Sequence, residues 1–186
     1  MLEIRIHSRG GQGGVIAGKL MAVALHKEGQ HVQAFPTFGV ERRAAPVMSF
    51  VRFDDKPIRI RTQIYTPDHI VILDQSLISM LDVTQGLKPG GTILINSERN
   101  PDDFSFDSKF NVVTVDASAI AIKHGLGSVT QPIVNTSILG AVSQILKIFN
   151  IESVVGAIKE DVPAKTEQNA LAAQEAYEVA GELVKL

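Results

Sequence analysis

The sequence of 186 residues contains no cysteine and no tryptophan, and aromatic residues make up only 5% of it. Without cysteine the chain can form no disulfide, no thiolate metal site and no cysteine-ligated iron–sulfur cluster, and it has no cysteine nucleophile. No apolar run is long enough to span a bilayer, and no signal peptide precedes the first predicted strand. We therefore expect a cytoplasmic protein without a membrane segment.

The charges are divided unevenly along the chain. Residues 1–62 carry a net charge of +5 and residues 63–186 a net charge of −7. A basic first third favours an anionic ligand or an acidic partner surface. We expect no nucleic-acid partner, because no basic helix, zinc pattern or aromatic platform accompanies this charge. The five histidines are scattered without metal-ligand spacing, so we also expect no metal site.

Hydrophobic periodicity predicts the fold class. Strand patterns occur at 2–6, 31–36, 47–53, 69–73, 92–95 and 112–115, and helical patterns at 15–27, 76–87, 135–150, 152–159 and 167–186. Because strands and helices alternate, we expect a single α/β domain over residues 1–186. It should be Rossmann-like and doubly wound, with a mostly parallel sheet and C-terminal helices. Segments 47–53 and 57–61 alternate around a turn signal and predict an antiparallel hairpin excursion.

A glycine-rich loop joins the first predicted strand to the first predicted helix. It comprises Gly10, Gly11, Gln12, Gly13 and Gly14. Such a loop leaves backbone N–H groups uncovered at the positive end of a helix, where a phosphate or carboxylate can bind.

Two nucleotide-binding motifs fit this loop only in part. A dinucleotide-binding loop needs G-x-G-x-x-G and a later acidic residue, but Ile16 replaces the third glycine and the strand 31–36 ends without an acid. A P-loop needs a hydroxyl residue after its lysine, but Leu20 follows Lys19. The alternative to an anion site is that the glycines only permit close packing of helix on strand, which Gly18 also suits.

Polar residues follow the predicted strands, at the edge where a parallel sheet opens a crevice. The candidates are Ser8, Arg9, Thr37, Asp74, Asn96 and Asp116. Asp74 and Asp116 also suit the N-caps of the segments that follow them. No three of these residues make a nucleophile, a base and an orienting group. The sequence therefore assigns no catalytic residue to this chain.

The segment 38–46, FGVERRAAP, follows neither the helical nor the strand period. Arg42 and Arg43 stand side by side in it, among apolar and small residues. Arginines next to apolar anchors are typical of an anion clamp or a protein–protein contact, and a solvated surface patch is the alternative.

Taken together, these segments resemble a known family. SRGGQGGVIAGK, FGVERRAAPV, VILDQS and QPIVNTSILGA occur in this order, as they do in the gamma subunits of 2-oxoacid:ferredoxin oxidoreductases. The resemblance covers essentially the whole chain. FGVERRAAPV is most similar to the pyruvate branch. Other branches tend to carry tyrosine, glycine, proline and glutamate, then arginine and two glycines, where this chain has Val40 and Ala44-Ala45.

The resemblance implies a subunit of an enzyme that converts pyruvate, coenzyme A (CoA) and oxidised ferredoxin into acetyl-CoA, CO2 and reduced ferredoxin. It implies alpha, beta and delta partner subunits that hold thiamine diphosphate, Mg2+ and 4Fe-4S clusters, and ferredoxin as the acceptor of the complex. This chain would bind no cofactor alone. It would contribute to assembly and contact CoA or the cofactor cleft.

The residues that this resemblance places at the cleft are Arg9, Gly10, Gly11, Gln12, Gly13, Gly14, Arg42, Arg43 and Asn135. Asn135 also suits a helix N-cap. Three alternatives stay open. The chain could be a free-standing Rossmann-like nucleotide-binding protein or NAD-type oxidoreductase, a purely structural subunit, or a gamma subunit for another 2-oxoacid.

Overall fold

The computed structural model describes residues 1–37 and 44–183, and its centre is a six-stranded sheet in the order β2-β3-β1-β4-β5-β6. The strands are β1 (Leu2–Arg9), β2 (His31–Pro36), β3 (Pro46–Asp54), β4 (His69–Ile72), β5 (Thr92–Asn96) and β6 (Asn111–Val115). β1, β4, β5 and β6 run parallel to one another, whereas β3 lies antiparallel between β1 and β2. The expected α/β fold with a mostly parallel sheet is confirmed.

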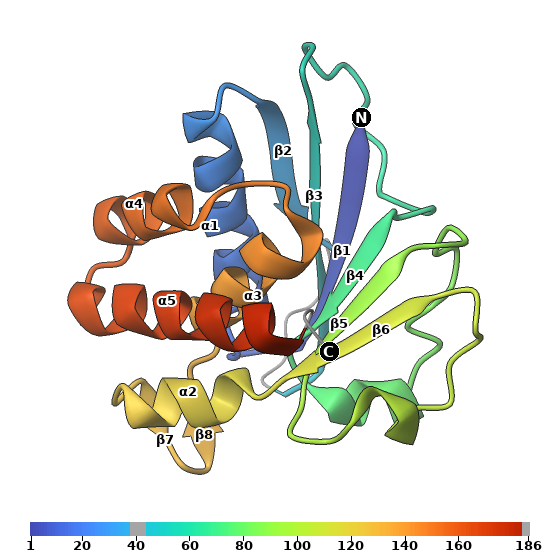
Figure 1. The fold of residues 1–186 in the computed structure, drawn as a ribbon. Coiled ribbons are helices and arrows are strands. Elements are labelled where there is room, and N and C mark those ends of the chain that lie inside the picture. Colours follow the sequence, from blue (N-terminus) through green and yellow to red (C-terminus); the bar gives the residue numbers. More distant parts are fainter. Residues whose placement is uncertain (38–43, 184–186) are drawn as a thin grey trace.

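Five α-helices cover one face of the sheet (Figure 1). They are α1 (Gly14–Lys27), α2 (Ala117–Lys123), α3 (Ser137–Leu146), α4 (Ile151–Asp161) and α5 (Thr166–Leu183). Aliphatic side chains of the strands, such as Ile4, Ile6 and Leu94, meet alanine-rich and leucine-rich helix faces in the larger core. The C-terminal helices are thus confirmed with shifted ends, while α2 and the short hairpin of β7 (Gly127–Ser128) and β8 (Gln131–Pro132) were not predicted.

The opposite face of β4 and β5 is covered by irregular segments. Among the described residues, the predicted helix 76–87 is reduced to a 3₁₀ helix at Gln75–Ser79, followed by turns. The cause is tertiary, because the buried Arg5 guanidinium donates hydrogen bonds to the carbonyls of Val83 (2.9 Å) and Gln85 (2.7 Å). An intact helix over 76–87 would use the Val83 carbonyl within its own turns.

The antiparallel excursion is present, but its partners differ from the predicted hairpin. β3 pairs with β1 and β2, and segment 57–61 forms no strand. Gln33 donates a hydrogen bond to the Ile58 carbonyl, and the buried Arg52 donates to the carbonyls of Ile60 and Thr62. Hydrogen bonds from these side chains fix the backbone of segment 57–61, and they take over the role of the hydrogen bonds of a strand ladder. In the described ranges no helix is long and apolar enough to cross a membrane.

Candidate functional site

The carboxyl ends of β1, β4, β5 and β6 open into a cleft of about 970 Å³. The glycine loop lines one part of it, and residues 127, 128 and 130–134, which include the β7–β8 hairpin, line another. Between them lie polar residues that follow the strands: Asp74, Gln75, Asn96, Ser97, Glu98, Asp116 and Ser118. Of the sequence-predicted site residues, Arg9, Gly10, Gly11 and Gln12 line this cleft.

The backbone of the loop explains two of its glycines. Gly11 has φ +96° and Gly13 has φ +80°, a region that residues with a side chain rarely adopt. A Cβ at Gly14 would collide with the Ser8 side chain, so close packing of helix on strand is required there. Gly18 imposes no such requirement, since a Cβ there would meet no atom closer than 3.5 Å.

The start of α1 carries hydrogen-bond donors behind the cleft wall, since Gly13 and Gly14 do not line the cleft and Gly14 is buried. Its N-cap residue is Gly13, and no side chain caps the helix. The N–H groups of Gly11, Gly13 and Gly14 donate to no other described residue. Uncapped N–H groups at the positive end of a 14-residue helix favour an acceptor-rich or anionic ligand.

Arg9 does not point a free charge into the cleft. Its Nε lies 3.1 Å from Asp74 Oδ2, and its other guanidinium nitrogens donate to the Ser76 hydroxyl and the Ala44 carbonyl. Gln12 completes the cluster, because its Oε1 accepts from the Arg9 N–H and its Nε2 donates to Asp74 at 2.8 Å. The cluster fixes the loop against β4.

Asp74 is ionised in this arrangement. Burial raises the pKa of its carboxyl group, but hydrogen bonds from Ser76 and Gln12 and the charge of Arg9 outweigh burial, so the pKa lies below its ordinary value. Asp74 and Asp116 also cap the elements that follow them, by accepting from Ser76 N–H and Ala119 N–H, as predicted. The cleft therefore has a donor-rich end at the loop and carboxylates along its centre.

Asn135 lies behind the loop and does not line the cleft. It is 7% exposed, and its Nδ2 lies 2.7 Å from the position that a Cβ on Gly13 would occupy. Its Oδ1 is buried without a hydrogen-bond partner. The N-cap of α3 is Thr136, so the N-cap interpretation of Asn135 is wrong. Its side chain instead fills the space left by the missing side chain of Gly13.

Two predicted site residues, Arg42 and Arg43, lie outside the described residues. The sequence interpretation also missed lining residues of the cleft, namely Gln75, Ser97, Glu98, Ser118 and segment 127–134. Gln75 and Ser97 follow strand ends, and their side chains are joined by a 2.7 Å hydrogen bond. Their positions one residue beyond Asp74 and Asn96 are the signal that could have identified them.

Comparisons with known proteins agree over nearly the whole chain. The model of the pyruvate ferredoxin/flavodoxin oxidoreductase family matches residues 3–179. The pyruvate/ketoisovalerate oxidoreductases common subunit gamma of Thermococcus kodakarensis is 51% identical over 181 residues, which cover 95% of this chain and 96% of the relative. Pyruvate synthase subunit PorC of Methanothermobacter thermautotrophicus is 46% identical, over 96% of this chain and 95% of the relative.

A solved structure shows the same architecture. The pyruvate oxidoreductase subunit PORC of Thermotoga maritima superposes with a TM-score of 0.80 at 31% identity, and the match covers 95% of both chains.

Proposed function

The chain belongs to the pyruvate ferredoxin/flavodoxin oxidoreductase family, and from this premise we propose that it is the gamma subunit of a pyruvate:ferredoxin oxidoreductase. The observation that carries the proposal is the end-to-end match to relatives named as gamma or PorC subunits, together with the shared fold. The chain is an enzyme subunit that is not active alone. It works in the cytoplasm, and the complex oxidises pyruvate with CoA and reduces ferredoxin.

The hard chemistry belongs to partner subunits. Alpha, beta and delta subunits hold thiamine diphosphate with Mg2+ and the iron–sulfur clusters, which supply decarboxylation and electron transfer. The absence of cysteine from this chain fits that division, since it has no thiolate to offer a cluster. What this chain contributes is a rigid polar cleft and surfaces for assembly.

The cleft fits CoA at its glycine-loop end. Gly11 lines the cleft, and its N–H group is available to phosphate or amide oxygens at the positive end of α1. Arg9 is already paired with Asp74, so it orients the loop, and the loop amides are the principal contacts to the ligand. Arg42 and Arg43, which the sequence alone assigns to this site, would supply cationic contacts to phosphate.

A second substrate assignment is favoured by one observation. Relatives about half identical to this chain are named as subunits common to pyruvate and ketoisovalerate oxidoreductases. A shared gamma subunit would serve either 2-oxoacid, because the substrate pocket lies on other subunits. Pyruvate remains our first assignment, supported by the segment FGVERRAAPV and the PorC relatives.

Reconstitution tests the proposal. The chain is co-expressed with the alpha, beta and delta subunits from its own source, and the purified material is assayed for pyruvate-dependent, CoA-dependent reduction of ferredoxin. We expect one stable complex that loses CoA-dependent activity when this chain is omitted. A chain that purifies alone as a monomer or homodimer with a bound nucleotide would contradict the proposal and support the free-standing binding protein. Parallel assays with pyruvate and 2-ketoisovalerate decide between the two substrate assignments.

A further inference from the structure

β2 is an edge strand of the sheet, and among the described residues no strand pairs with its outer side. The Thr37 N–H donates to the Met48 carbonyl at 2.8 Å, and the register places Phe35 opposite Phe50. Because directly bonded and non-bonded pairs alternate in an antiparallel ladder, Gln33 and Phe35 exchange hydrogen bonds with β3. The N–H and C=O groups of Val32 and Ala34 therefore point outward from the sheet.

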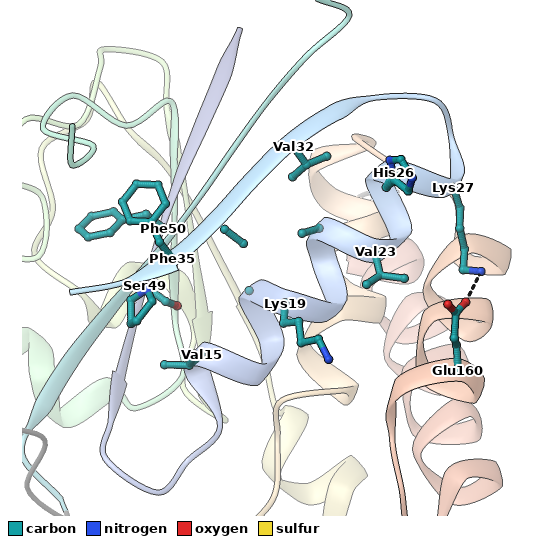
Figure 2. A pocket seen from close by; sticks show the side chains of 14 residues that line it. Val15, Lys19, Val23, His26, Lys27, Val32, Phe35, Ser49, Phe50 and Glu160 are labelled. Atoms are coloured by element: carbon teal, nitrogen blue, oxygen red, sulfur yellow. Dashed lines mark hydrogen bonds and ion pairs between the residues drawn. The ribbon is translucent and has the colours of Figure 1, made fainter. Parts of the chain in front are cut away.

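The same two residues line a groove between β2 and α1. The groove has a volume of about 630 Å³. Val15 and Val23 project from α1 along one wall, and Val32 projects from β2 on the other (Figure 2). Ala34 and Pro36 continue the β2 wall. A row of unpaired backbone groups thus runs beside an apolar channel.

The charges at the rim of this groove are matched within the chain. Lys27 and Glu160 form an ion pair, drawn as a dashed line in Figure 2, with Nζ 2.7 Å from the carboxylate, and Lys19 Nζ lies 3.3 Å from Asp161. With both lysines paired, His26 is the remaining titratable group that lines the groove. A phosphate or an acidic peptide would compete with a carboxylate for each lysine. An uncharged apolar segment leaves both ion pairs intact and matches the neutral groove.

Edge strands are ordinarily protected by lysine, by an inward charge or by a covering element. β2 has the sequence HVQAFP, without lysine, and its proline stands at the last position. Water can satisfy outward N–H and C=O groups singly, but an extended polypeptide satisfies them in register at successive alternate residues.

We propose that β2 and the α1–β2 groove dock an extended, apolar, uncharged segment of a partner subunit, which adds a seventh strand beside β2. The new strand pairs with Val32 and Ala34, and its alternate side chains enter the groove against Val15 and Val23. This surface is distinct from the cleft at the carboxyl ends of the strands. The inference rests on the proposed function for the existence of partner subunits.

Hydrogen exchange on the wild-type protein tests this pairing directly. Amide exchange rates of Val32 and Ala34 are measured in the isolated chain and in the reconstituted complex, with Gln33 and Phe35 as internal controls because β3 already protects them. We expect protection of the Val32 and Ala34 amides to rise at least about tenfold in the complex. Unchanged rates for both amides in an assembled complex would overturn the inference.

Two further outcomes separate the possible causes. If protection develops in the isolated chain as its concentration rises, the occupant is a second copy, and the inference is wrong. If no complex forms at all, the proposed function fails, and the exchange experiment with partner subunits cannot support a docked strand either.

The variant Ala34→Pro provides a second test. Proline removes the outward N–H without removing a bond of the β3 ladder, whereas Ala34→Val keeps the donor and serves as the matched control. We expect Ala34→Pro to weaken association with the partner subunits about tenfold and Ala34→Val to change it less than about threefold. Urea unfolding of the isolated variants shows whether both remain folded. Equal affinities of two folded variants would contradict the pairing.

Discussion

The two faces of the sheet are built with different chemistry at β1 and β3. On the helix-covered face, Ile4 and Ile6 of β1 meet aliphatic helix residues. On the other face, the intervening positions of β1 and the adjacent β3 carry the buried groups Arg5, His7 and Arg52. Apolar side chains hold the helices on the first face by area and fit, whereas Arg5 and Arg52 on the other face hold irregular segments by hydrogen bonds to their carbonyls. The first mode is visible in the periodicity of a sequence, and the second is not.

Of the substitutions that test this comparison, replacement of Arg52 should have the largest effect on the free energy of unfolding. Arg52 is 1% exposed, pairs with Glu3 at 3.0 Å and donates to the carbonyls of Ile60 and Thr62. Arg52→Ala leaves a largely buried carboxylate and two carbonyls without partners, so we expect a loss of about 3–5 kcal/mol in the free energy of unfolding. Urea unfolding measures it. The double variant Arg52→Met with Glu3→Gln should recover part of the loss, and a loss below about 1 kcal/mol in Arg52→Ala would remove the distinction between the faces.

On the helical face, the corresponding test is Gly140→Ala. A Cβ at Gly140 in α3 would collide with the Ala173 carbonyl of α5. The helices must separate to accept it, so we expect destabilisation by about 3 kcal/mol in urea unfolding. Unchanged stability would mean that this face is loosely packed.

His7, on the sheet face that irregular segments cover, should make the stability of the protein sensitive to acid. Burial and then the charge of Arg5 lower the pKa of His7 to about 3, and its Nε2 accepts from Arg5 Nε at 3.0 Å. The folded-state pKa lies below the unfolded value, so the stabilisation is complete above about pH 6.5 and is lost as the pH falls towards 3. We expect His7 to account for ~2 kcal/mol of the stability lost between pH 7 and pH 5.

The variant His7→Gln isolates that contribution, since glutamine keeps an acceptor for Arg5 but does not titrate. Urea unfolding at pH 7 and pH 5 should show a smaller acid-induced loss in the variant than in the wild type. Identical losses in the two proteins would show that His7 is not responsible.

The smallest expected effect on stability is a stabilisation, the opposite sign from the other substitutions. Gly156 lies in α4 on the helical face, and a Cβ there would meet only the Lys27 side chain at 3.6 Å. Gly156→Ala should stabilise the protein by about 0.5–1 kcal/mol, because alanine is the better helix former and the space is open. Thermal unfolding should show a higher Tm than for the wild type. A lower Tm would mean that tight packing extends beyond the α3–α5 contact.

The same contrast explains what the sequence could predict. The six strands were predicted to within a few residues, because short apolar runs rich in β-branched residues are a local sequence pattern of buried strands. The predictions for 57–61 and 76–87 failed, because Arg52 and Arg5 bind the carbonyls of those segments from distant strands. No local sequence pattern predicts a hydrogen bond between residues some 80 positions apart, such as the bond from Arg5 to Gln85.

The site was predictable in its position and less so in its chemistry. The glycine loop, Asp74 and Asp116 were correctly placed at one edge, because parallel strands end together. The pairing of Arg9 with Asp74 and the position of Asn135 behind Gly13 depend on tertiary packing. Both findings move the expected ligand contacts from side chains to the amides of the loop.

One measurement tests most directly the central claim that the glycine loop of this subunit faces CoA. Gly11 is open, with no atom within 4 Å of the position that a Cβ would occupy, and Gly11→Asp and Gly11→Asn must both adopt its φ of +96°, so this nearly isosteric pair differs mainly in charge. In the reconstituted oxidoreductase we expect Gly11→Asp to raise the KM for CoA about tenfold above that of Gly11→Asn, with similar kcat at saturating CoA. Equal KM values for the two variants in an intact complex would contradict the claim.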